Sequence, residues 1–199
     1  MIIGLDFIWL HFPKCAGTET EAILRRLFAD DPALAFDTVE PGRINWHHSV
    51  AERRVATGFD PGARAVICNI RRLPSWLLSR VHAGVARTPE HRVTREMLLA
   101  GRFPRHDGVE LSADDLMRRY TEHPVAHWIR TEHFAEDFTA AFGRFLKLDG
   151  IVPQRHANTA PLPYIRDPRF FFTRAEIDGL YRANPVWAAM ERKVYGSLG

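Results

Sequence analysis

Two short apolar segments, each followed at once by a helical pattern, constrain the fold of this chain more than any other feature. The segments are DFIWLHF (6–12) and RAVICNIR (64–71), and both are rich in the β-branched and aromatic residues typical of buried strands. GTETEAILRRLF (17–28) follows the first, and PSWLLSRVHAGV (74–85) follows the second with Pro74 in its first turn. The sequence therefore predicts an α/β fold with a central, mainly parallel sheet flanked by helices.

The rest of the chain continues this alternation of strands and helices. Ser112 and Thr173 each precede a helical pattern with an acid three residues later, which is the signature of a capped helix start. Pro185 lacks the N–H that a continuous helix needs, so the tail is expected to divide at Asn184-Pro185. The further predicted elements are helices over 112–123 and 135–148, a third strand over 127–134, and two tail helices within 172–196.

Size and composition favour a single soluble domain over residues 1–199. With 46% apolar residues, 199 residues can bury one sizeable core, and no repeat, low-complexity tract or charge block marks a linker. With 27 dispersed Lys and Arg residues and a net charge of +3, the surface suits an anionic ligand but not nucleic acid. There are only two cysteines and no apolar stretch that could span a membrane, so we expect a cytoplasmic protein without structural disulfides.

The first loop has the features of an anion-binding turn. In FPKCAGT (12–18) a strand ends, and small residues at 15–17 let the backbone approach a ligand at the start of the next helix. Lys14 adds a positive charge there. The order differs from the Walker A pattern, in which the lysine follows the glycines. Taken alone, the loop is explained equally well as a plain strand-to-helix turn.

The second strand-to-helix junction carries candidates for a second phosphate site. Arg71 ends the strand, and Ser79 lies about two helical turns into the following helix. A guanidinium and a hydroxyl that meet at a strand end can hold a phosphate, although either residue alone could be an ordinary surface residue. Together with the first loop, they predict an anion site at the carboxyl ends of the strands, where parallel sheets bind ligands.

These two motifs, in this order and spacing, resemble those of the sulfotransferases that use 3′-phosphoadenosine 5′-phosphosulfate (PAPS), especially the carbohydrate branch. LHFPKCAGTET (10–20) is similar to the family's first loop, HxPKTAGTS, and Arg71 with Ser79 matches its second motif. WIRTEHFAEDF (128–138) and NTAPLPYI (158–165) resemble later family segments. The resemblance implies a P-loop-like three-layer fold and transfer of a sulfuryl group to a hydroxyl of a glycan or other small acceptor.

The resemblance also implies how the nucleotide is held. Lys14 would contact the phosphosulfate and neutralise the bridging oxygen, backbone amides and the Thr18 hydroxyl would hold the 5′-phosphate, and Arg71 with Ser79 would hold the 3′-phosphate. No metal is required, because the sulfuryl group carries less charge than a terminal phosphoryl group. The residues expected at the nucleotide are Lys14, Cys15, Ala16, Gly17, Thr18, Glu19, Thr20, Arg71 and Ser79.

The acceptor hydroxyl needs a general base, which in the carbohydrate branch is often a histidine a few tens of residues after the first loop. INWHHSV (44–50) supplies His47 and His48 there, and imidazole has a suitable pKa. His48 is the preferred candidate and His47 the second, although each could equally be a packing or surface histidine. Glu19 departs from the family's Ser or Thr and would repel a phosphate, unless it points away or Thr20 takes over the hydroxyl role.

Two other functions fit parts of this pattern. A nucleotide-dependent small-molecule kinase would need ATP and Mg²⁺, but Lys14 precedes the glycine and no apolar strand ends in a paired acid. A non-catalytic nucleotide- or polyanion-binding relative would bind without turnover, and Glu19 is the kind of change that could have removed activity.

Overall fold

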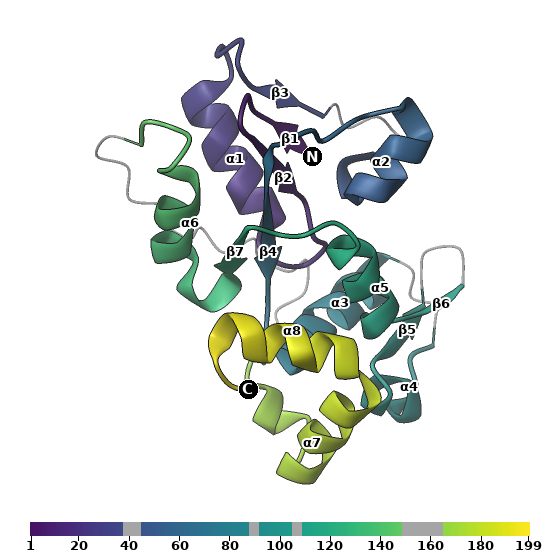
Figure 1. Cartoon of the computed structure of the whole chain (residues 1–199). Coiled ribbons are helices and arrows are strands. Elements are labelled where there is room, and N and C mark those ends of the chain that lie inside the picture. Colours follow the sequence, from purple (N-terminus) through teal and green to yellow (C-terminus); the bar gives the residue numbers. More distant parts are fainter. Residues whose placement is uncertain (38–44, 88–91, 105–108, 149–164) are drawn as a thin grey trace. The chain divides into compact units, whose positions relative to one another are not determined.

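The computed structural model describes residues 1–37, 45–87, 92–104, 109–148 and 165–199 (Figure 1). The chain divides into two compact units, Met1–Ile70 with Arg119–Asn158 and Arg71–Arg118 with Thr159–Gly199. The expectation that all 199 residues form one domain stays a prediction. None of the helices in the described ranges has the length and apolar character needed to span a bilayer.

The first unit is built on a five-stranded sheet with the order β3-β1-β2-β4-β7. The three strands β2, β4 and β7 run parallel, whereas β1 pairs antiparallel with both β2 and β3. Its elements, in chain order, are β1 (Ile2–Ile3), β2 (Phe7–Leu10), α1 (Gly17–Phe28), β3 (Ala35–Phe36), η1 (Asn45–His47), α2 (Val50–Thr57), β4 (Ala65–Ile70), β7 (His127–Arg130), η2 (Thr131–His133) and α6 (Phe134–Phe142).

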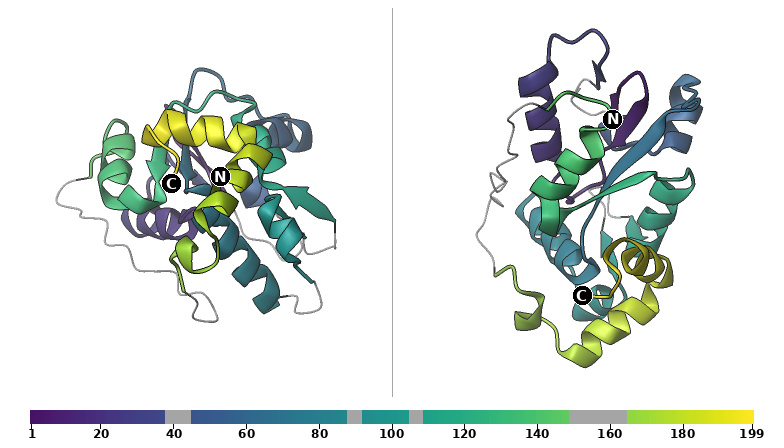
Figure 2. Two further views of the ribbon diagram at one scale, coloured as in Figure 1. Left: turned by 90° about the horizontal axis from the view of Figure 1, so that it is seen from below. Right: turned by 60° about the vertical axis from the view of Figure 1, so that its left-hand side comes forward.

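Helices α1 and α6 cover one face of this sheet (Figures 1 and 2). Alternate strand residues point to that face, so Phe7 and Trp9 of β2 lie beside Ile67 of β4 and Ile129 of β7. The helices add Ile23 and Leu24 from α1 and Phe134, Phe138, Ala141 and Phe142 from α6. The prediction of an α/β fold with a mainly parallel sheet flanked by helices is confirmed, whereas the P-loop-like classification stays a prediction.

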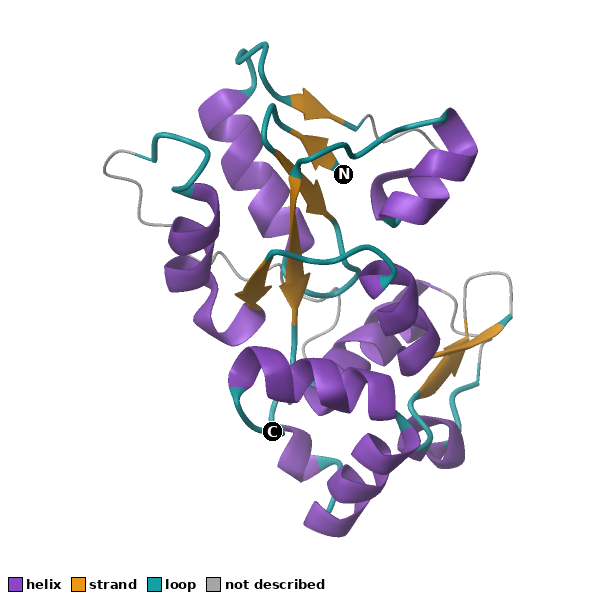
Figure 3. Ribbon diagram, viewed as in Figure 1, coloured by secondary structure: helices purple, strands orange, loops and turns teal. Residues whose placement is uncertain are grey.

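The second unit is mainly helical (Figure 3). Trp76 is fully buried in it, with its ring 4.6 Å from the Trp187 ring and 5.3 Å from the Phe103 ring between centroids. Helix α5 begins here, and its last turn, from Arg119, belongs to the first unit. The elements are α3 (Leu73–Arg87), α4 (Arg95–Leu99), β5 (Arg102–Pro104), β6 (Glu110–Ser112), α5 (Ala113–Thr121), η3 (Pro168–Phe170), α7 (Arg174–Ala183) and α8 (Pro185–Tyr195).

Most elements predicted from the sequence are present, with two corrections to their ends. The third strand stops at Arg130 instead of continuing to 134, because the 3-10 helix η2 follows and leads into α6. Helix α6 stops at Phe142 instead of 148, and Gly143 follows it. The predicted N-caps are confirmed, since the Asp115 N–H donates to Ser112 Oγ at 3.0 Å and Thr173 forms a capping box.

Candidate functional site

The loop between β2 and α1 contains two residues in strained backbone conformations. Lys14 has φ 65° and Ala16 has φ 61°, and among the described residues no other non-glycine residue has a positive φ. Each left-handed residue of this kind costs about 1–3 kcal/mol, and such strain tends to collect at ligand-binding and active sites. A plain strand-to-helix connection does not require two strained residues, so this loop conformation needs another explanation.

Helix α1 starts directly after this loop without a side-chain cap. Ala16 is the N-cap residue and makes no side-chain hydrogen bond to the helix. The first N–H groups of a helix lack intrahelical acceptors and carry partial positive charge, so this end can accept an anion. Thr18 is exposed in the first turn, and Lys14 and Glu19 are partly exposed. Pro13 and Ala16 are partly exposed as well, so Lys14, Thr18 and Glu19 are the polar side chains of the loop region that solvent reaches.

Packing alone requires a glycine at position 17. A Cβ atom at this position would overlap the imidazole ring of His11. His11 follows β2 directly and is only 6% exposed, so its ring has little room to move away. The sequence pattern had suggested that Gly17 lets the backbone approach a phosphate. The structure adds a second reason, which is close contact with His11.

Thr20 belongs to a buried hydrogen-bond chain that joins β2, β4 and α1. The Trp9 indole N–H donates to Asn69 Oδ1 at 2.7 Å, and Asn69 Nδ2 donates to Thr20 Oγ1 at 3.1 Å. The Thr20 hydroxyl then donates to the carbonyl of Ala16 at 3.2 Å. Thr20 and Asn69 are both 0% exposed. In this arrangement the Thr20 hydroxyl both accepts and donates a hydrogen bond inside the protein, and it supports the loop from below.

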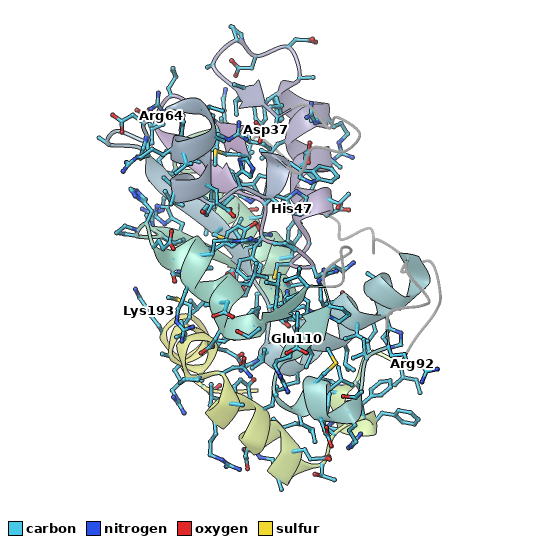
Figure 4. All side chains as sticks on the ribbon, turned by 90° about the vertical axis from the view of Figure 1, so that its right-hand side faces the viewer. Asp37, His47, Arg64, Arg92, Glu110 and Lys193 are labelled. Carbon is cyan, nitrogen blue, oxygen red and sulfur yellow. The ribbon has the colours of Figure 1, made fainter. Side chains whose placement is uncertain are left out.

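His47 is hydrogen-bonded to His11, the residue that directly follows β2. Its Nδ1 lies 2.9 Å from the His11 carbonyl oxygen, and the two imidazole rings are 4.6 Å apart between centroids. The Tyr120 hydroxyl lies 3.1 Å from the same carbonyl and 2.6 Å from the His47 carbonyl. His48 has no such bond, since its Nδ1 is buried without a hydrogen-bond partner among the described residues. The structure therefore places His47, and not His48, in a defined contact with the residue that follows β2. His47 is labelled in Figure 4.

Burial favours the neutral form of His11 and of His48. The pKa of His11 lies well below its ordinary value of 6.5, chiefly because the ring is desolvated and secondly because His47 is near. The Glu21 carboxylate is 3.9 Å from His11 Nδ1 and does not reverse this effect. Desolvation also lowers the pKa of His48. Neutral imidazoles are the expected forms at neutral pH for these two side chains.

Arg71 and Ser79 belong to the second unit, whereas Lys14 to Thr20, His47 and His48 belong to the first. Arg71 directly follows β4, and its Nε is buried without a hydrogen-bond partner in the described part of the chain. Ser79 is a partly exposed residue of α3. Segment 158–164, which contributed to the family resemblance, lies outside the described residues.

Other arginines at strand ends are held by carboxylates. Arg72 lies 3.0 Å from Glu191, whose side chain is fully buried, and Arg130 lies 2.7 Å from Asp137. Each of these pairs is contained within one unit. Arg71 differs from these two arginines, because it forms no ion pair with a carboxylate among the described residues.

A cavity of about 200 Å³ lies at the start of α3 in the second unit, and none of the predicted nucleotide-binding residues lines it. Its lining residues are Arg72, Pro74, Ser75, Asp167, Pro168, Arg169, Ile177 and Gly199.

Among the residues that the structure describes, no group of three or more His, Cys, Asp and Glu side chains is arranged to hold a metal ion. Comparison of the chain with protein-family models, with curated proteins and with solved structures gives no match.

Asn69 and Tyr120 contribute to this region but were not singled out in the sequence. Asn69 could have been found, because it is the polar residue in the apolar run AVICNI and a buried polar residue needs a partner. Tyr120 gave no comparable signal. It lies in a predicted helix far along the chain from His11 and His47, and its hydroxyl bonds depend on tertiary packing.

Proposed function

We propose that this chain is a PAPS-dependent sulfotransferase that transfers a sulfuryl group to a hydroxyl of a glycan or other small acceptor. The observation that carries the proposal is the strained loop after β2, where Lys14 and Ala16 adopt left-handed conformations and lead into an uncapped helix. Such a loop is a costly feature that an anion-binding site explains. The sequence resemblance narrows the anion to a nucleotide with a 3′-phosphate and a 5′-phosphosulfate.

In this proposal, the backbone N–H groups at the start of α1 bind the 5′-phosphate, and the Thr18 hydroxyl adds a donor. Lys14 neutralises the oxygen that bridges phosphorus and sulfur as it becomes the leaving group. The donor nucleotide supplies the activated sulfuryl group, so the protein's tasks are in-line positioning and charge stabilisation. Arg71 and Ser79 are proposed to bind the 3′-phosphate, and only the sequence resemblance supports this role.

Binding of the desulfated nucleotide, 3′-phosphoadenosine 5′-phosphate, tests the proposal directly. Isothermal calorimetry on the wild-type chain should show binding that Lys14→Ala weakens. Lys193→Ala is the matched control, because Lys193 is an exposed residue of α8 in the second unit (Figure 4). Absence of binding by the wild type, or equal binding by both variants, would refute the proposed site.

Transfer of labelled sulfate from PAPS to a panel of glycans separates the remaining functions. Lys14→Ala should lower the rate about 10²–10³-fold, which is the usual effect of removing one group that stabilises charge in the transition state. Nucleotide binding without any transfer would favour the non-catalytic relative. Activity that needs ATP and Mg²⁺ would favour the kinase.

A further inference from the structure

A buried tyrosine holds the segment that carries the candidate bases. Tyr120, from the last turn of α5, is 1% exposed, and its ring packs on Phe12 with centroids 4.5 Å apart. Its hydroxyl lies within hydrogen-bond distance of two backbone carbonyls, at 2.6 Å from His47 and 3.1 Å from His11. Burial raises the pKa of Tyr120 well above its ordinary value, so the hydroxyl keeps its proton and acts as the donor. All four residues belong to the first unit.

The bond between His47 and His11 determines where the His47 ring carries its proton. A backbone carbonyl can only accept, so the nitrogen that bonds to it must be protonated. His47 Nδ1 is 2.9 Å from the His11 carbonyl, which makes the neutral ring the Nδ1–H tautomer. The lone pair of the neutral ring is then on Nε2, and this nitrogen is the one that can accept a proton.

Tyr120 fixes the two ends of this bond relative to each other. The His11 carbonyl is the acceptor for His47. The Tyr120 hydroxyl has a single proton, which it shares between the His47 carbonyl at 2.6 Å and the His11 carbonyl at 3.1 Å, and the shorter contact to His47 is the stronger one. His48 lacks an equivalent device, because its Nδ1 has no hydrogen-bond partner among the described residues. A general base needs a fixed position and a fixed tautomer, and the contacts supply both for His47 only.

We propose that His47 is the general base of the sulfuryl transfer and that Tyr120 is a positioning residue that fixes its place and tautomer. This inference rests on the proposed function. His47 Nε2 takes the proton of the acceptor hydroxyl while the acceptor oxygen forms its bond to sulfur. The bond between sulfur and the bridging oxygen breaks, and its electron pair leaves on the 5′-phosphate of the nucleotide, beside Lys14. The order of preference between the histidines is thereby reversed from that of the sequence.

The first test compares His47→Gln with His48→Gln, using labelled-sulfate transfer and calorimetry with 3′-phosphoadenosine 5′-phosphate. His47→Gln should lose about 10²–10⁴-fold in transfer rate, the usual contribution of a general base, while nucleotide affinity is unchanged. His48→Gln should keep most of its activity. The opposite result would assign the base to His48 and overturn the inference, while the unchanged nucleotide affinity would leave the proposed function standing.

The second test measures the tautomer, which a merely structural tyrosine would not affect. Nitrogen-15 NMR of histidine-labelled protein, with His47 assigned by its Gln variant, should show the Nδ1–H form in the wild type. Tyr120→Phe should shift His47 toward the Nε2–H form and lower kcat at least about tenfold, equivalent to 1.4 kcal/mol of transition-state stabilisation. Tyr181→Phe is the control, because its buried hydroxyl bonds to Glu191 in the second unit.

The outcomes separate this inference from the proposed function. An Nε2–H form of His47 in the wild type would overturn the inference even if Tyr120→Phe fails to fold, and so would unaltered kcat and tautomer in Tyr120→Phe. Failure of the wild type to bind 3′-phosphoadenosine 5′-phosphate would instead overturn the proposed function, and the base assignment with it.

Discussion

Replacing Thr20 by valine distinguishes a structural hydroxyl from a ligand-binding one. Valine has nearly the same shape as threonine and a similar helix propensity, so the change removes the hydroxyl and little else. In the structure, that hydroxyl accepts from Asn69 at 3.1 Å and donates to the Ala16 carbonyl at 3.2 Å. The Ala16 carbonyl keeps its bond from the Thr20 N–H at 3.0 Å, so Asn69 Nδ2 is the group that loses its acceptor.

The expected cost follows from leaving that amide donor buried and unsatisfied. Such a group costs about 1–3 kcal/mol, and the added methyl of valine offsets up to about 0.8 kcal/mol. We therefore expect Thr20→Val to lower the free energy of unfolding by about 1–2 kcal/mol. Urea denaturation measures this loss. Affinity for 3′-phosphoadenosine 5′-phosphate, measured under conditions where the variant is folded, should change little.

Thr139→Val is the matched control for this experiment. Thr139 also donates to a carbonyl four residues earlier in its helix, at 2.9 Å from the Ala135 oxygen, but its side chain is exposed. Its replacement should change stability by no more than about 0.5 kcal/mol. If Thr20→Val instead keeps wild-type stability and loses nucleotide affinity, the hydroxyl binds the ligand and our assignment of Thr20 is wrong.

Three further changes test other contacts. Gly17→Ala should cost about 1–3 kcal/mol in urea denaturation because its Cβ meets the His11 ring, whereas Gly179→Ala, with more room in α7, should be neutral or stabilising. Glu191→Leu should cost about 3–5 kcal/mol, because the buried Leu73 N–H and Tyr181 hydroxyl lose their acceptor; a loss below about 1 kcal/mol would contradict this. The lowered pKa of His11 means that the unfolded chain binds more protons below pH 6.5, so stability should fall by up to about 1.4 kcal/mol per pH unit below that value, and less steeply in His11→Asn.

The sequence predicted the elements that have strong local signals. Helix α1 spans Gly17–Phe28, as the amphipathic pattern predicted, and β2 and β4 lie within the two apolar runs. β1 and β3 are two residues long, too short for periodicity to show, and they form only by pairing with their neighbours. Helix α2 was missed although its signal was present, since Ser49 and Glu52 form a capping box.

The sequence predicted which residues form the candidate site, but not which of them pack inside the protein and which reach solvent. The motif residues Cys15, Gly17 and Thr20 are buried, whereas Lys14 and Thr18 reach solvent. At a strand-to-helix junction, both packing beneath the loop and contact with a ligand favour particular residue types. The sequence pattern alone does not show which of these two causes applies to a given residue. The side-chain burial separates them.

Glu19, which the motif alone did not explain, has a physical role in the unliganded helix. Ala16 gives α1 no side-chain cap, and Glu19 is the acid in its first turn. A carboxylate there interacts favourably with the positive end of the helix dipole, typically by 0.3–1 kcal/mol. The same position weakens an incoming anion, because a phosphate at the helix start would meet a negative charge instead of the hydroxyl of the family pattern. The Glu19 carboxylate thus stabilises the uncapped start of α1 but repels the proposed nucleotide. In the proposed site, Lys14 and the backbone N–H groups must therefore supply the attraction for the phosphate.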